Sequence, residues 1–184
     1  VVGAAAGSDA LVVIDAATAK LASPAAVCAL AVRKGRYAAG CLDGAVRIYG
    51  GGGVTTWAGF QAPVRAVAFS GSGWLLAAGG RALACVAPGL DRGEAPVLGV
   101  APRRPRWAHA AWRPGPRPIL AAASVDGRGF VFDVARADDA VPRAAAPVRC
   151  LDLDAAAAVA FSGSRLVVAG RAGAVGVADD DCEF

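Results

Sequence analysis

The sequence predicts an all-β fold made of repeated small antiparallel sheets, and three observations support this prediction. The phrase AVAFSGS occurs at residues 66–72 and again at 158–164, and an apolar run with small residues follows each copy. A pattern of apolar strand, tight turn and alternating strand recurs five times. No segment of helical length has a convincing 3.6-residue periodicity. A strand–turn–strand unit that recurs along the chain indicates a repeat architecture.

Five hairpins follow one another along the chain, and we label their two strands b and c. They are expected at residues 1–14, 37–49, 75–86, 119–133 and 166–177. An Asp-Gly pair between apolar runs is a strong hairpin signal, because both residues can adopt positive φ. Asp43-Gly44 and Asp126-Gly127 are such pairs, so we expect them to be structural turn residues.

A nearly continuous apolar run precedes each of the last four hairpins, as expected of a strand buried on both faces. We label it strand a and expect it at residues 27–32, 64–69, 107–112 and 156–161. Candidate fourth strands, labelled d, lie at residues 54–58, 96–100 and 148–153. Phe69, Trp112 and Phe161 share one position in strand a, which predicts that they are core residues.

The starts of strand c are 35, 37, 46 and 46 residues apart, near the ~40–45 residues of a four-stranded propeller blade. We therefore expect one β-propeller domain over residues 1–184, with repeats at approximately 1–22, 23–60, 61–100, 101–153 and 154–184. These four to five blades begin and end within a blade. Together with the absence of Met, this predicts a fragment of a larger propeller whose other blades lie outside this chain.

Composition narrows the function classes. The chain is 56% hydrophobic and 18% charged, which argues against disorder, and no apolar run reaches the ~18–20 residues of a membrane helix. A net charge of +4 suits an acidic partner. The cysteines are odd in number and form no CxxC pair, so we expect reduced thiols rather than disulfides or a zinc site. They are Cys28, Cys41, Cys85, Cys150 and Cys182.

Two hairpin segments resemble the end of a WD40 repeat, in which Ser-x-Asp-Gly precedes an apolar strand and Trp-Asp. They are CLDGAVRIY at 41–49 and SVDGRGFVFD at 124–133, and AVAFSGS resembles the start of the repeat body. The sequence departs from the family because the Gly-His pair is absent and the final Trp is replaced by Tyr49, Phe132 and Ala178. The family's Asp–His–Ser–Trp network therefore cannot form in full, and its remnants are Asp43, Asp126 and Ser124.

Within that family, residues 109–179 resemble the late blades of dynein intermediate chains. Those blades have a Trp-x-Pro turn, a small-residue strand b and a Phe-Asp-Leu-type strand end, and here the matching segments are WRP at 112–114, ILAAAS at 119–124 and FDV at 132–134. The resemblance implies a subunit that attaches cargo or assembles a microtubule motor complex in the cytoplasm or cilium.

The densest basic stretch contains Arg103, Arg104, Arg106, Arg113 and Arg117. In the expected fold, the strand at 107–112 separates the first three arginines from the last two and places them at opposite ends of a sheet. Two interpretations stay open for Arg103, Arg104 and Arg106: a solvated loop, or a loop that contacts a partner such as an acidic protein, a nucleic acid or a phosphate group.

No residue set indicates catalysis, and we expect neither a metal nor a cofactor. His109 lacks a second His and an adjacent nucleophile. We place it one strand period from Trp107, on the face opposite Ala110 and Trp112. Glycines 50–53 precede no phosphate-binding motif. The acidic residues near the end match no calcium loop; they are Asp179, Asp180, Asp181 and Glu183.

The expected function is a non-catalytic protein-interaction scaffold in the cytoplasm, cytoskeleton or cilium, with protein partners, no membrane partner and nucleic acid disfavoured. Two alternatives stay open, because a fold does not fix a function. One is a propeller enzyme such as a metal-dependent hydrolase with acidic residues along a central channel. The other is a nucleic-acid-binding protein that uses its basic loops.

Overall fold

The computed structural model describes residues 2–4, 10–13, 19–50, 53–86, 106–134, 156–163, 165–170 and 175–179. Every regular element within these ranges is a β-strand, and the strands form five antiparallel sheets. The predicted all-β class is therefore confirmed.

Each sheet is formed by consecutive strands. The first contains β1 (Val2–Ala4), β2 (Ala10–Val13) and β3 (Ala19–Ala22). The second contains β4 (Val27–Arg33), β5 (Arg36–Cys41), β6 (Val46–Gly50) and β7 (Gly53–Trp57). The third contains β8 (Val64–Phe69), β9 (Leu75–Gly79) and β10 (Ala82–Val86). The fourth contains β11 (Trp107–Trp112), β12 (Ile119–Ser124) and β13 (Gly129–Asp133). The fifth contains β14 (Ala156–Ser162), β15 (Arg165–Gly170) and β16 (Val175–Asp179).

The strand order is the one that the hairpin pattern predicts. Strands β4, β8, β11 and β14 are the four a strands, and β7 is the d strand expected at 54–58. The d strands expected at 96–100 and 148–153 lie outside the described residues. The division of the chain into five repeats stays a prediction.

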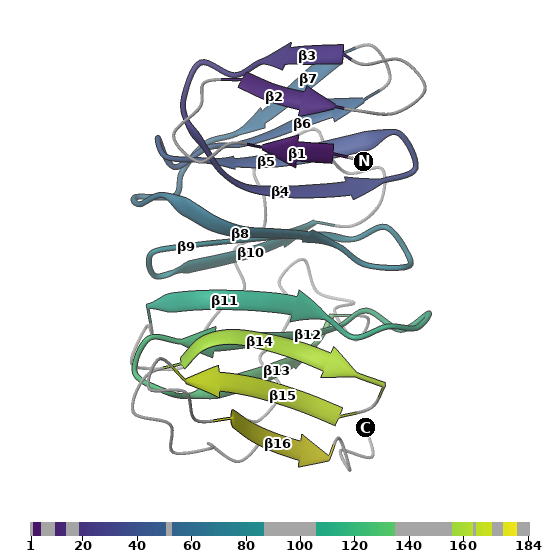
Figure 1. Cartoon of the computed structure of the whole chain (residues 1–184), viewed down its shortest axis with the longest axis vertical. Coiled ribbons are helices and arrows are strands. Elements are labelled where there is room, and N and C mark those ends of the chain that lie inside the picture. The colour runs from purple at the N-terminus through teal and green to yellow at the C-terminus, as the bar shows by residue number, and fades with distance from the viewer. Residues whose placement is uncertain are drawn as a thin grey trace.

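The five sheets are stacked face to face in chain order (Figure 1). Strand β4 packs on β8, β8 on β11, and β11 on β14, so the a strands hold consecutive sheets together. The first sheet lies at the top of Figure 1 and the fifth at the bottom. The stack is therefore open between these two sheets, as predicted for a partial ring.

Small residues in strand b allow neighbouring sheets to approach closely. In β9, Leu75 and Ala77 pack between the second and third sheets, whereas Leu76 and Ala78 pack between the third and fourth. In β5, a Cβ on Gly40 would lie only 2.7 Å from Val64 Cγ1 of the next sheet. A strand buried on both faces has no polar side, which explains the continuous apolar runs in the sequence.

A β-bulge recurs near the start of every a strand. The register shifts between Val27 and Ala29 in β4, and at the equivalent place in β8, β11 and β14. The extra residue reverses the alternation of side chains, so Trp107 and Ala110 pack in one cluster although they are three residues apart. The expectation that His109 shares the face of Trp107 is therefore wrong. The expectation that His109 and Ala110 lie on opposite faces of the sheet is correct. Ala110 packs in the cluster between the third and fourth sheets, whereas His109 Nδ1 accepts a hydrogen bond from Val159 N of the fifth sheet at 3.4 Å.

The Asp-Gly turns do not have positive φ at both residues. Gly44 has φ 79° and Gly127 has φ 90°, whereas neither Asp43 nor Asp126 has positive φ. The Gly44 amide donates to Cys41 O at 3.2 Å, and Cys41 N donates to Ala45 O at 2.9 Å, so the loop has three residues. In such loops a type I turn precedes one left-handed residue, and only that position requires glycine. This corrects the two-residue turn expected from the sequence.

The two copies of AVAFSGS form equivalent strands but different turns. After the first copy, Ser70 Oγ accepts hydrogen bonds from the amides of Gly73 at 3.1 Å and Trp74 at 2.9 Å, which closes a three-residue loop. In the second copy, Ser162 pairs directly with Arg165. The first copy has one more residue before its apolar run, Gly73, and the wider loop accommodates it.

Candidate functional site

The turns between strands a and b meet along one end of the stack, on the right-hand side of Figure 1. We name the turns at residues 33–36, 70–74 and 113–118 the a–b rim. Arg33 Nη2 donates a hydrogen bond to Gly71 O at 2.7 Å, which links the first two turns. A Cβ on Gly71 would lie 3.2 Å from Gly115 O, so the second and third turns are also adjacent. The rim is therefore continuous across three sheets.

The a–b rim is rich in basic residues. Its turns contain no Asp or Glu, and Arg165 occupies the matching position in the fifth sheet. Basic groups gathered on one surface raise the local positive potential and attract acidic partners. The basic residues of the rim are Arg33, Lys34, Arg36, Arg113 and Arg117.

Aromatic residues support the rim from beneath. The prediction that Phe69, Trp112 and Phe161 are core residues is wrong in part, because all three are only partly buried at the margins of the buried clusters. The Arg36 guanidinium lies 5.6 Å from the centre of the Phe69 ring, a cation–π geometry. Trp112 Nε1 donates to Ala68 O of the preceding sheet at 2.9 Å. These contacts hold neighbouring turns together.

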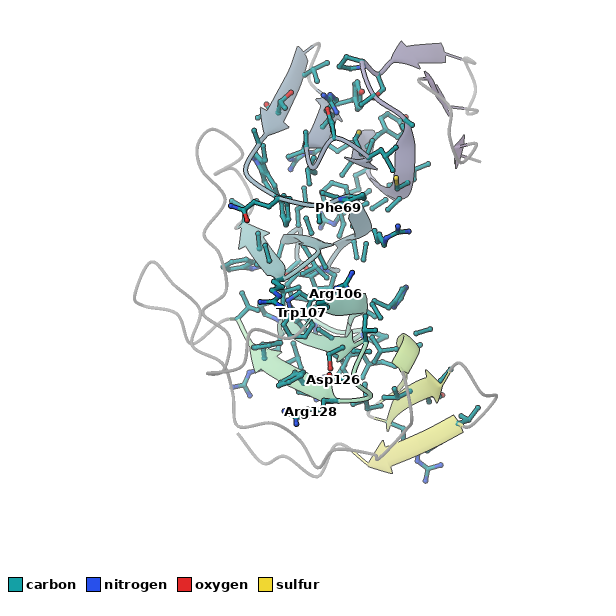
Figure 2. The ribbon with its side chains drawn as sticks, turned by 90° about the vertical axis from the view of Figure 1, so that its left-hand side faces the viewer. Phe69, Arg106, Trp107, Asp126 and Arg128 are labelled. Carbon is teal, nitrogen blue, oxygen red and sulfur yellow. The ribbon has the colours of Figure 1, made fainter. Side chains whose placement is uncertain are left out.

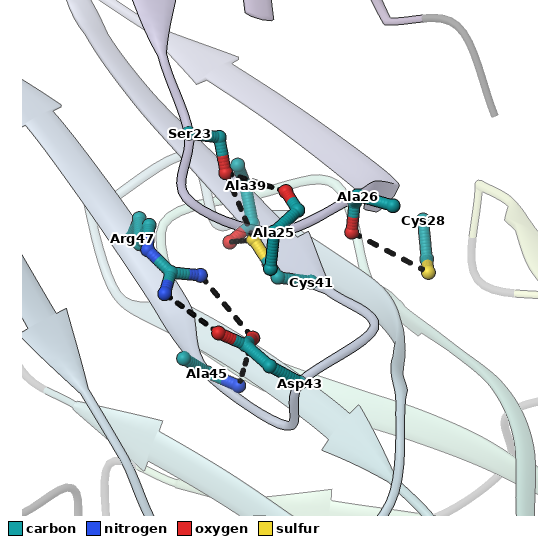
Figure 3. A network of polar contacts seen from close by, with 9 residues as sticks. All are labelled: Ser23, Ala25, Ala26, Cys28, Ala39, Cys41, Asp43, Ala45 and Arg47. Carbon is teal, nitrogen blue, oxygen red and sulfur yellow. Dashed lines mark hydrogen bonds and ion pairs between the residues drawn. The ribbon is translucent and has the colours of Figure 1, made fainter. Parts of the chain in front are cut away.

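At the opposite end of the sheets, basic side chains have acidic neighbours within the same hairpin. Arg47 Nη2 lies 2.7 Å from Asp43 Oδ2, and Arg47 Nη1 donates to Asp43 Oδ1 at 3.2 Å (Figure 3). Arg128 Nε lies 3.7 Å from Asp126 Oδ2, and both residues are labelled in Figure 2. These b–c hairpins therefore contain their own counter-charges.

The Asp43–Arg47 pair shifts the titration of both groups. The side chain of Arg47 is only 9% exposed, and its hydrogen bond to Asp43 raises the pKa of the guanidinium. The same hydrogen bond is the main cause that lowers the pKa of the Asp43 carboxyl, and the Ala45 amide, which donates to Asp43 Oδ1 at 3.1 Å, lowers it further. The pair fixes the b–c hairpin of the second sheet.

We expect Asp43→Asn to reduce the loss of stability in acid. A carboxyl whose pKa is lower in the folded state stabilises the fold above its unfolded pKa, about 3.9, and this contribution is lost as the pH falls through the folded pKa. Because the Asp43 side chain is 39% exposed, the effect should be about 0.5–1 kcal/mol. Urea unfolding at pH 7 and pH 3 measures it. An unchanged pH dependence in the variant would contradict the assignment.

The sequence cluster of five arginines does not form one patch. Arg106 is exposed and directly precedes β11, whereas Arg113 directly follows that strand and belongs to the a–b rim (Figure 2 labels Arg106). Arg103 and Arg104 lie outside the described residues. Sequence reasoning missed the rim because its charges come from turns about 80 residues apart in the chain. The recurrence of Arg beside the a–b turns was the available signal.

The described residues contain no group of three or more His, Cys, Asp or Glu that could hold a metal ion. Cys28, Cys41 and Cys85 are free thiols, and burial raises the pKa of Cys85, which opposes thiolate formation. In the part of the chain that the structure describes, no helix is long and apolar enough to cross a membrane.

Comparisons with known proteins establish the fold. No family model and no curated protein match the chain. The structure resembles that of the computationally designed protein Ika4, with a TM-score of 0.68, 17% identity, and coverage of 85% of this chain and 92% of Ika4. It also resembles the β-propeller domain of Cps50 (Swd1) from Myceliophteria thermophila, with a TM-score of 0.67, 16% identity, and coverage of 88% of this chain and 56% of that domain. The chain has a β-propeller fold.

The propeller formed by this chain is an open arc. A second designed protein, Ika8, matches 96% of this chain with a TM-score of 0.72 and 16% identity, but only 57% of Ika8 is covered. The chain thus spans little more than half the length of Ika8 and of the Cps50 domain. At these identities the likeness concerns the fold alone, and the rims of the propeller have to be interpreted from their own residues.

Proposed function

We propose that this protein is a non-catalytic scaffold that binds partner proteins through the a–b rim of its propeller. The observation that carries the proposal is the continuity of this rim: three turns from successive sheets contact each other and bring together five basic residues. The packed sheets beneath hold the turns in place, so the surface is ordered before a partner binds. Preorganisation of this kind reduces the entropy lost on association.

The chemistry of the rim favours an acidic protein surface. Arg33, Arg36 and the other guanidinium groups can pair with carboxylates in bidentate geometry. Proline on either side of Gly115 restricts the turn at 113–118, which limits the loss of freedom on binding. The resemblance of residues 109–179 to dynein intermediate chains suggests a first partner class, the subunits of a microtubule motor complex in the cytoplasm or cilium, and WD40-type scaffolding as the general role.

Affinity purification with mass spectrometry tests the proposal when charge variants are included. The rim variant is Arg33→Glu with Lys34→Glu, and the matched control is Arg81→Glu with Arg106→Glu, two exposed arginines outside the rim. We expect that the wild type and the control variant retain a common set of partner proteins and that the rim variant loses them. This result would support the scaffold proposal. Partners retained equally by both variants would overturn the rim as the binding surface.

Two further outcomes separate the finer claims. If the partners that depend on the rim include no dynein subunit, the motor-complex assignment fails and the scaffold proposal stands. If the rim variant instead loses salt-dependent binding to RNA or DNA and no protein partner, the partner class is nucleic acid rather than protein.

A further inference from the structure

His109 occupies a position that is alanine in β4, β8 and β14. Each of the aligned residues directly follows the bulge of its strand, and the alanines are Ala29, Ala66 and Ala158. A small residue at this position lets the next sheet approach closely, as Ala66 does where it packs in one cluster with Trp107. The histidine is therefore a departure from the repeat, and it lies at the junction of the fourth and fifth sheets.

The imidazole of His109 links these two sheets through a polar contact. Its Nδ1 atom accepts a hydrogen bond from the Val159 amide at 3.4 Å. Strand β14 is an edge strand of the fifth sheet, so alternate amides of this strand face away from its neighbour β15. A backbone amide can only donate, so Nδ1 must be unprotonated and the ring must be neutral, with its proton on Nε2.

The four strands nearest to β11 contain no acidic residue that could pair with a charged imidazole. Strands β9, β12 and β14 have no titratable side chain, and β8 has only Arg65. Arg106 directly precedes β11, and Arg113 directly follows it. In the b–c turn of the fourth sheet, Asp126 already has partners within its own hairpin. Protonation of His109 would therefore add a cation where these segments supply no counter-charge.

We propose that His109 is a pH-sensitive link between the fourth and fifth sheets. The neutral ring binds the Val159 amide and ties the edge of β14 to β11. A proton on Nδ1 turns the acceptor into a second donor that opposes this amide, so the contact is present at neutral pH and is lost in acid. Apolar packing between the sheets does not depend on this proton, so acid loosens the edge of β14 without unfolding the protein.

The sequence makes this link experimentally accessible. Histidine is the side-chain type that ordinarily gains a proton between pH 8 and pH 5. His109 is the only histidine of the chain, so a change at β14 within this pH range can be assigned to one side chain by substituting it.

Hydrogen exchange of the Val159 amide, measured by NMR at pH 7.5 and pH 5 and corrected for the intrinsic exchange rate, tests the proposal. We expect the protection of this amide to fall by about threefold to tenfold at pH 5, as for the loss of one hydrogen bond. The internal control is the Val134 amide, which donates to Pro118 O at 3.0 Å in the fourth sheet and should keep its protection. Nitrogen-15 spectra of the ring should show the proton on Nε2 at pH 7.5.

Two substitutions separate the link from general effects of acid. His109→Asn places an uncharged amide oxygen at the position of Nδ1, so it should remove the pH dependence and keep the Val159 amide protected. His109→Ala restores the residue of the other a strands, so the variant should fold, but the Val159 amide should be weakly protected at both pH values. Circular dichroism should show the same β-sheet signal for both variants and the wild type.

Three results would overturn the proposal. The first is equal protection of the Val159 amide in the wild type at pH 7.5 and pH 5. The second is a pH-dependent loss of the same size in His109→Asn, and the third is an equal loss at the Val134 amide. In the last two cases a group other than this imidazole would cause the change.

Discussion

Replacing Phe132 with Ala should lower the free energy of unfolding by about 3–5 kcal/mol. Phe132 is fully buried in the cluster between the third and fourth sheets. Its ring centre lies 6.3 Å from that of Trp107 in an edge-on geometry and 6.4 Å from that of Phe130 in a stacked one. Alanine would leave a cavity between two sheets whose backbones the hydrogen-bonded ladders hold in place, so the site cannot collapse to fill it.

Urea unfolding monitored by circular dichroism at pH 7 measures this loss. Phe132→Leu is the matched variant, because it retains most of the apolar volume and should cost less than about 1.5 kcal/mol. Val54→Ala, at an exposed position on β7, should change stability by less than about 0.5 kcal/mol. If Phe132→Ala cost no more than Val54→Ala, the cluster would not be the centre of the fold.

Replacing Gly44 with Ala should cost at least about 3 kcal/mol, the second large effect expected. Gly44 has φ 79°, and a Cβ there would collide with Phe60 O and lie 3.3 Å from Ala62 O. Both neighbours are backbone atoms of the segment that leads into β8, so they cannot rotate away as a side chain could. Relief of the clash would require the hairpin or that segment to move.

Gly35 provides the control because it shares the conformation of Gly44 without the crowding. It has φ 75°, and a Cβ there would have no atom within 4 Å. Gly35→Ala should therefore cost only the conformational penalty, about 1–2 kcal/mol. Thermal unfolding of both variants under identical conditions measures the difference. Equal losses would show that conformation alone, and not contact with Phe60, makes glycine necessary at residue 44.

The turns show how far local sequence information reaches. Asp43-Gly44 marks a hairpin correctly because turn chemistry depends on adjacent residues. The same pair does not determine the loop length, since Cys41, Leu42 and Ala45 also contribute to the turn. Lys34-Gly35, which has no distinctive hairpin signature, has positive φ at both residues. Strand pairing between Arg33 and Arg36 sets that geometry.

The strands show a similar limit. Alternation within β11 predicts that His109 lies opposite Ala110, but the bulge between Trp107 and His109 moves Trp107 to the other face. A bulge is a property of the pairing between β11 and β12, and one strand's sequence does not reveal it. Trp107 therefore enters the core, and Trp112 lies near the rim.

The all-β class, the hairpins and the order of strands could be predicted from the sequence, because they follow from the spacing of apolar runs and turn residues. The stacking of the sheets decides which turns form the a–b rim. Arg33 and Arg113 belong to one rim because the turn at 70–74 contacts both the turn at 33–36 and the turn at 113–118. Such relations depend on contacts between distant segments, which local patterns do not encode.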